Sequence, residues 1–144
     1  MHTILGEEKL ISVFGYWPSF HDAEVWELRY ERVPSGFSLV AVIHVFEMTD
    51  EVTTQGYFKL VKHTRVALRF NVCSEVSFSR FNHQNVLYSL DISKEDGLDA
   101  KYPFIVSFDS SYGLEGRLKC QSIEVIEAIP WIPPHGVYAH YAHE

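Results

Sequence analysis

His21 and Asp22, a histidine beside an acid, form the pair in this sequence best suited to chemistry. A histidine oriented by a carboxylate can act as a general base, and Glu24 follows close behind. Adjacent residues of a strand point to opposite faces, however, so these two side chains meet only where the backbone turns. We therefore favour a structural role, in which Trp17 and Phe20 anchor a helix to a sheet and the pair hydrogen-bonds backbone groups at an irregular corner. A small hydrolase that uses His21 and Asp22 is the alternative.

Metal and nucleophile chemistry has weaker support. The chain has eight histidines, and three of them lie near its end: His135, His140 and His143. Their spacing matches no established ligand motif, and the histidines at 21, 44, 63 and 83 form no i,i+2 strand pair and no i,i+4 helix pair. Cys73 and Cys120 form no C-x-x-C motif, and neither a nucleophile elbow nor a phosphate-binding loop occurs. We expect two reduced thiols, no structural or catalytic metal and no cofactor, with adventitious binding by the tail histidines left open.

Acidic residues outnumber basic ones by 19 to 12, which gives a formal charge of −7. This balance argues against a nucleic-acid or anionic-membrane binder, since both need clustered cations. Residues 59–80 carry five cations and one acid, so the rest of the chain carries −11. Two acidic clusters are candidates for docking a basic protein: Glu24, Glu27 and Glu31 on an expected strand, and Asp91, Glu95, Asp96 and Asp99 in an expected loop. A third group of acids follows the second expected strand, and ordinary solvation is the alternative for every group.

The N-terminus lacks the features of a targeting segment. Glu7 and Glu8 lie where a signal peptide has cations followed by an apolar stretch. No window approaches the ~18 uninterrupted apolar residues that a membrane span requires. We therefore expect a cytoplasmic protein.

The apolar residues change their period once along the chain. Their helical spacing predicts one amphipathic helix over about residues 3–14, stopped by Gly15 and then Pro18. Beyond residue 24 the alternation of apolar and polar residues predicts strands, and the run 37–46 is apolar on both faces, hence central in its sheet. About seven strands are expected up to residue 130, with residues 85–90 open to either a strand or a helical turn. Loops are expected at 49–56, 91–101 and 109–116.

These elements predict a single mostly-β (α+β) domain over residues 1–144, with its β core at about 24–130. Short strands at hairpin spacing form an antiparallel β-sandwich or a partly open barrel, and the N-terminal helix covers one opening. The strand–helix alternation of a doubly wound nucleotide fold is missing. Three prolines end the regular structure from residue 130 onward, and the tail 135–144 is expected to be loose.

With these motifs in view, the chain resembles the immunity protein 50 family of bacterial polymorphic-toxin systems. The resemblance rests first on residues 17–25, Trp-Pro-Ser-Phe-His-Asp-Ala-Glu-Val, which are similar to the family's opening signature before its first strand. It continues at residues 44–49, at 68–70 with 81–82 and 84–87, and in the hairpin 112–116 before Cys120. The similar segments run from about residue 14 to residue 130.

The resemblance implies a mostly-β cytoplasmic protein that binds and neutralises a cognate toxin, without catalysis or a cofactor. We interpret the matching residues as markers of the fold and not as toxin contacts: Trp17, Pro18, Phe20, His21, Asp22, Phe81, Asn82 and Asn85. Because the chain is acidic, we expect a basic toxin such as a nuclease, bound through the two acidic clusters. We expect a monomer or weak homodimer with no nucleic-acid or membrane partner, and a structural subunit of an obligate oligomer is the remaining alternative.

Overall fold

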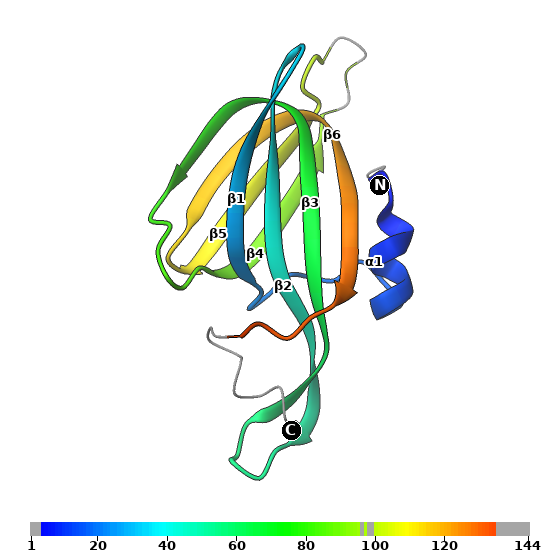
Figure 1. Cartoon of the computed structure of the whole chain (residues 1–144), viewed down its shortest axis with the longest axis vertical. Helices are drawn as coiled ribbons and strands as arrows, with labels where there is room; N and C mark the ends of the chain where they lie inside the picture. Colours follow the sequence, from blue (N-terminus) through cyan, green and yellow to red (C-terminus); the bar gives the residue numbers. More distant parts are fainter. Residues whose placement is uncertain (1–3, 96, 98–99, 135–144) are drawn as a thin grey trace.

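The computed structural model describes residues 4–95, 97 and 100–134. The described residues form six strands in one antiparallel sheet, which closes on itself into a ring in the order β1-β2-β3-β6-β5-β4 (Figure 1). The elements are α1 (Glu7–Phe14), β1 (Glu24–Val33), β2 (Gly36–Val52), β3 (Phe58–Ser79), β4 (Val86–Lys94), β5 (Phe104–Tyr112) and β6 (Glu115–Pro130). The prediction of a mostly-β antiparallel fold with one N-terminal helix is confirmed, and the ring is closer to the partly open barrel than to the sandwich.

The strand predicted to be central is β2, which pairs with β1 on one side and β3 on the other. Its inward side chains, such as Ile43, belong to the core, while the outward Val40 and Val42 are buried as well. Arg29 of β1 and Arg69 of β3 are the register partners of Val40, so their aliphatic stems are placed to cover it. This cover explains why the face of β2 that points away from the inside of the ring is apolar as well.

The ring closes at one short junction. β1 meets β4 at a single register pair, Glu24 with Val86. The Val25 amide donates to the Asn85 carbonyl at 2.8 Å and extends this junction. Beyond Val25, β1 pairs with β2 alone among the described residues.

The strands are fewer and longer than the about seven that the sequence predicts. β3 runs unbroken for 22 residues, through the point where separate short strands are expected. It bends instead of ending, because Val72 and Glu75 both adopt a positive φ of 51° and the register with β6 shifts between Ser74 and Ser77. Residues 85–90 are strand from Val86 onward, and not a helical turn.

The predicted loops are shorter than expected. β2 continues to Val52, β4 to Lys94 and β5 to Tyr112, so each takes up residues of an expected loop. Polar residues can continue these strands because their backbone N–H and C=O groups still pair with the neighbouring strand. The regular structure ends at Pro130 as predicted, while the tail 135–144 lies outside the described residues.

The helix begins later than predicted. Leu5 lies along the edge of β6, where its amide donates to the Ile123 carbonyl at 2.9 Å and its carbonyl accepts from the Val125 amide at 2.7 Å. Gly6 then turns the chain with a φ of 70°, and α1 starts at residue 7. Its end is as predicted, because Gly15 adopts the left-handed conformation of a C-terminal cap. Figure 1 shows α1 beside β6.

The two cysteines lie opposite each other across the β3–β6 ladder. Cys73 and Cys120 are register partners, and both thiols are free and buried. Burial raises the pKa of Cys73 to about 11 and that of Cys120 to about 12, so both stay protonated at neutral pH. The one helix among the described residues, eight residues long, is too short to cross a membrane.

Candidate interaction surfaces

The corner between α1 and β1 turns sharply. Phe20 and Asp22 adopt positive φ angles of 63° and 66°, and the Asp22 amide donates to the Leu87 carbonyl of β4 at 2.9 Å. The turn sends the Phe20 side chain into the core, with its ring 5.7 Å from that of Trp17. Phe20 is therefore the anchor that the sequence predicts, whereas Trp17 is only partly buried and packs against the core from its edge.

The turn also brings His21 and Asp22 to the same side of the chain. The Nε2 atom of His21 lies 3.6 Å from Oδ2 of Asp22, and the His21 side chain is 52% exposed. Its Nδ1 atom lies 2.9 Å from the Tyr88 carbonyl, which can only accept, so Nδ1 is the donor of this hydrogen bond. Both readings of the sequence are thus partly met: the histidine binds a backbone group at an irregular corner, and it also faces the acid.

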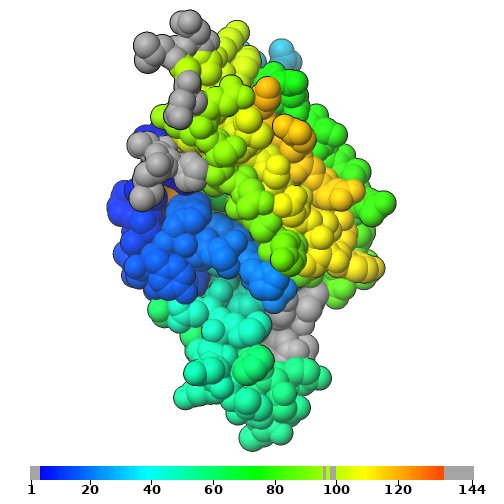
Figure 2. Space-filling model, turned by 180° about the vertical axis from the view of Figure 1, so that it is seen from behind, coloured from blue at the N-terminus to red at the C-terminus, as the bar shows by residue number. Residues whose placement is uncertain are grey.

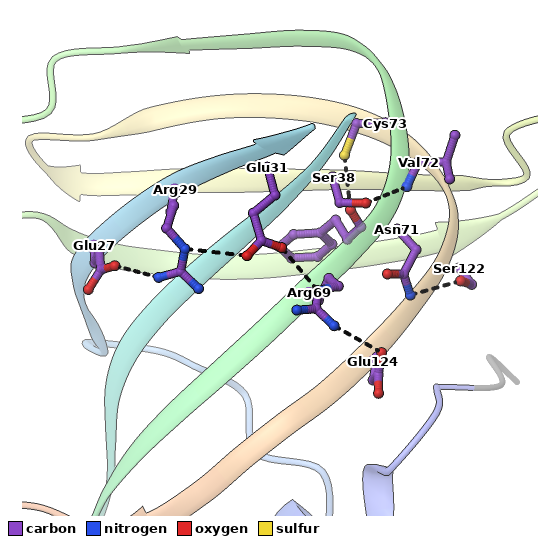
Figure 3. Close-up of polar contacts among 11 residues, drawn as sticks. Glu27, Arg29, Glu31, Ser38, Arg69, Asn71, Val72, Cys73, Ser122 and Glu124 are labelled. Carbon is purple, nitrogen blue, oxygen red and sulfur yellow. Dashed lines mark hydrogen bonds and ion pairs between the residues drawn. The ribbon is translucent and has the colours of Figure 1, made fainter. Parts of the chain in front are cut away.

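The first predicted acidic cluster is largely balanced by arginines. Glu24 is only 2% exposed. Arg29 binds Glu27 at 2.7 Å and Glu31 at 3.5 Å. Arg69 then continues the chain of ion pairs from Glu31 at 3.3 Å toward β6 (Figure 3). Glu27 and Glu31 therefore form a surface network across β1 and β3 in which cations already face them.

Asp91 of the second predicted cluster forms an acid pair with Asp109 that the sequence does not reveal. The Ser89 hydroxyl lies 3.0 Å from Oδ2 of Asp91 on the same strand and 3.0 Å from Oδ2 of Asp109 on β5. Sequence reasoning places Asp109 in a turn, because the β4–β5 register that sets it opposite Ser89 is not visible in the residues alone. Glu95 is exposed, and Asp96 and Asp99 lie outside the described residues.

Two histidines meet across β2 and β3, a contact that spacing within one strand cannot show. His44 Nε2 lies 2.9 Å from His63 Nδ1, and the rings stack with their centroids 5.1 Å apart. Trp131 packs edge-on against His44 and donates its amide to the His63 carbonyl at 3.1 Å. Burial, helped by the charge of His63, lowers the pKa of His44 to about 3, and burial also lowers the pKa of His63. Both rings therefore stay neutral at physiological pH.

Within the described part of the chain, no group of three or more His, Cys, Asp or Glu residues could hold a metal ion. The tail residues His135, His140 and His143 lie outside that part.

The comparison with protein families decides the class of protein. Residues 6–130 match the model of the family described as immunity protein 50. The chain belongs to the immunity protein 50 family. Membership indicates a toxin-neutralising role through binding of a cognate toxin, and immunity proteins are generally non-catalytic. Comparisons with curated proteins and with solved structures gave no match.

Three of the fold markers of this immunity protein 50 chain, Phe81, Asn82 and Asn85, lie in the loop between β3 and β4. Asn85 is buried, and its Oδ1 atom accepts from the amides of Asn82 at 2.9 Å and Leu114 at 3.1 Å. Its Nδ2 atom donates back to the Asn82 carbonyl at 2.8 Å. Phe81 on the same loop is half exposed, whereas Pro18 and Asn85 are buried. The eight fold markers therefore differ in how far their side chains are buried.

Proposed function

We propose that this immunity protein 50 chain neutralises a basic toxin, such as a nuclease, by forming a stoichiometric complex with it and without catalysing a reaction. The family supports the class of function, and the charge of −7 supports a basic partner. The single observation that carries the choice of surface is the carboxylate pair Asp91 and Asp109, which shares one serine hydroxyl on the outer face of β4 and β5.

Two like charges held together on a surface favour a cation between them. The single hydroxyl proton of Ser89 can bind only one of the two carboxylates at a time. The pKa of Asp91 is raised mainly by its hydrogen bond to Asp109, with a further contribution from the charge of that residue. A lysine or arginine from a partner is attracted by this pair and removes its internal repulsion.

The same face continues toward the corner between α1 and β1. Tyr88, next to Ser89, packs edge-on against His21 with the ring centroids 5.4 Å apart, and Asp22 follows His21 directly. Figure 2 presents this side of the molecule, with the corner in blue beside the yellow-green strands β4 and β5. Acids spaced along one face steer a basic partner over a Debye length of ~8–10 Å.

Of the other predicted contacts, Glu95 belongs to this proposed surface as the exposed residue after β4. Asp96 and Asp99 stay predictions. Glu27 and Glu31 are weaker candidates for toxin contacts, because Arg29 and Arg69 already form ion pairs with them. Glu24 is buried, so we propose that it acts through the fold.

The test uses the cognate toxin, which is to be sought first among the products of the neighbouring genes. Asp91→Asn with Asp109→Asn keeps the shape of both side chains and removes both charges. We expect the association rate at low salt to fall by about tenfold and the salt dependence of binding to weaken. The double variant Glu8→Gln with Glu51→Gln removes the same charge from exposed positions on α1 and β2, and should bind like the natural chain. Unchanged affinity and salt dependence in the Asp91/Asp109 variant would refute the surface.

The hydrolase alternative has one feature in its favour, the exposed His21 beside Asp22. The Nε2 atom of His21 lies 3.6 Å from the Asp22 carboxylate, however, and the nearby Ser19 hydroxyl accepts a hydrogen bond from the His21 backbone amide at 3.2 Å. This arrangement does not activate a nucleophile. Mass spectrometry of the toxin after incubation distinguishes the two functions, because a stoichiometric inhibitor leaves its mass unchanged.

We further propose that the protein acts in the cytoplasm, as a monomer or weak homodimer, and binds neither nucleic acid nor membrane. The acidic balance supports this set of partners, since phosphate-bearing surfaces repel it. Sedimentation at micromolar concentration checks the oligomeric state, and a stable obligate oligomer would favour the structural-subunit alternative.

A further inference from the structure

A pocket of about 460 Å³ lies between the corner at residues 16–22 and the middle of β2. Its walls come from residues 16–22 on one side and from Phe46, Glu47 and Met48 on the other. In Figure 2 the blue corner lies directly above the teal end of the β2–β3 hairpin, at this boundary. The volume is within the ~300–1,000 Å³ range of pockets that bind small groups.

Aromatic side chains stand on both walls of the pocket. Trp17 and Phe46 are partly buried and are held in place by packing, Trp17 against Phe20 and Phe46 against His44. Tyr16 and Met48 are about half exposed. Aromatic faces of this kind attract a cation, and they attract a flat guanidinium most strongly.

Two carboxylates lie among these aromatic side chains. Glu47 accepts a hydrogen bond from the Tyr16 hydroxyl at 2.7 Å through Oε1, and its Oε2 lies 3.5 Å from Lys62 Nζ. Asp22 contacts His21 at 3.6 Å. The two carboxylates outnumber the one lysine that faces them, so the formal charge of the group is negative. The Tyr16 hydroxyl is tied to Glu47, so the acid is fixed at the pocket wall.

We propose that this pocket receives one arginine side chain of the partner toxin, an inference that rests on the proposed function. The guanidinium stacks on the aromatic walls while its N–H groups bind Asp22 and Glu47. An anion is repelled by the two acids, and an apolar group would shield them from water without supplying a further hydrogen-bond donor. The pocket adjoins the Asp91–Asp109 surface through His21 and Tyr88, so one docked protein can occupy both.

The probe is the peptide acetyl-Gly-Arg-Gly-amide, titrated into the full ¹⁵N-labelled chain and followed by NMR. We expect saturable shifts of the Trp17 indole and the Met48 amide in the millimolar range, while the Trp131 indole stays in place. The lysine peptide should bind more weakly. The citrulline peptide, which has the same shape without the charge, should not bind. Equal responses to arginine and citrulline, or shifts that do not saturate, would overturn the inference.

Single variants identify the carboxylates. Glu47→Gln and Asp22→Asn should each weaken the arginine peptide by about tenfold, and asparagine suits the positive φ of residue 22. Glu8→Gln is the matched control on α1 and should leave the peptide affinity unchanged. Binding that survives both pocket variants places the peptide elsewhere and refutes the site.

The toxin itself separates this inference from the proposed function. Both stand if Glu47→Gln weakens the toxin complex and the Asp91/Asp109 variant weakens it too. Full toxin affinity in Glu47→Gln and Asp22→Asn, with a loss only in the Asp91/Asp109 variant, overturns the pocket and keeps the function. If the arginine peptide binds the pocket but the protein neutralises no toxin, the proposed function is overturned. The preference of the pocket for a guanidinium then still stands.

Discussion

The stacked pair His44 and His63 should make this fold lose stability in mild acid. His44 on β2 is fully buried, and the ring of Trp131 packs against its ring in an edge-to-face arrangement. Protonation puts a charge into this apolar cluster and pushes it against a second imidazole. The folded state therefore resists a proton that the unfolded chain accepts.

The size of the effect follows from the two pKa values of His44. In the folded protein its pKa is about 3, and in an unfolded chain a histidine has a pKa of about 6.5. Between these values the unfolded state binds one proton more, so the free energy of unfolding falls by about 1.4 kcal/mol per pH unit of acidification. The contribution is fully present above about pH 6.5, and about 2–3 kcal/mol of it is lost by about pH 4.5. His63 acts in the same direction, because its pKa is lowered too.

Urea denaturation followed by tryptophan fluorescence measures this dependence. His44→Leu keeps an apolar side chain against Trp131 and removes the titrating group. We expect its free energy of unfolding to fall less steeply with acidification than that of the natural chain, whatever its value at neutral pH. His83→Gln, which removes an exposed histidine, should keep the natural slope. Parallel profiles for His44→Leu and the natural chain between about pH 6.5 and pH 4.5 would refute the reasoning.

Three further substitutions test the corner and the loop. Asn85→Ala leaves the buried amide of Leu114 and the partly buried amide of Asn82 without their acceptor, and should cost about 1–3 kcal/mol in urea denaturation. Phe20→Ala removes a core ring and should cost about 3–5 kcal/mol, which a large drop in melting temperature would report. His21→Ala should cost less than about 1 kcal/mol, because its side chain is exposed, and the toxin complex measured by calorimetry should persist. A folded His21→Ala protein without toxin affinity would give the histidine a functional role.

The elements that the sequence predicts correctly depend on near neighbours in the chain. The helix ends at Gly15 because glycine adopts the left-handed cap there, and β6 ends at Pro130. The central place of β2 follows from a run that is apolar on both faces. The helix start is missed because Leu5 takes a place on the edge of β6, and that choice depends on a partner more than a hundred residues away.

For the candidate site too, the sequence predicts the features that depend on residue types and misses those that depend on distant contacts. The sequence marks the aromatic corner and the acidic clusters, and it predicts that Phe20 is an anchor. It cannot say that Glu24 is buried or that Arg69 crosses from β3 to reach Glu31. It also places Asp109 in a loop, whereas the structure sets it on β5 beside Ser89, which contacts Asp91 as well.

By itself, then, the amino-acid sequence determined the mostly-β class, the helix end, the charge and the family pattern, because each depends on residue types and short spacings. Only the tertiary structure decided which side chains meet: Asp91 with Asp109, and His44 with His63. Those contacts cross strands, so they depend on the register of the β2–β3 and β4–β5 ladders. A shift of one residue in either ladder would send these side chains to opposite faces.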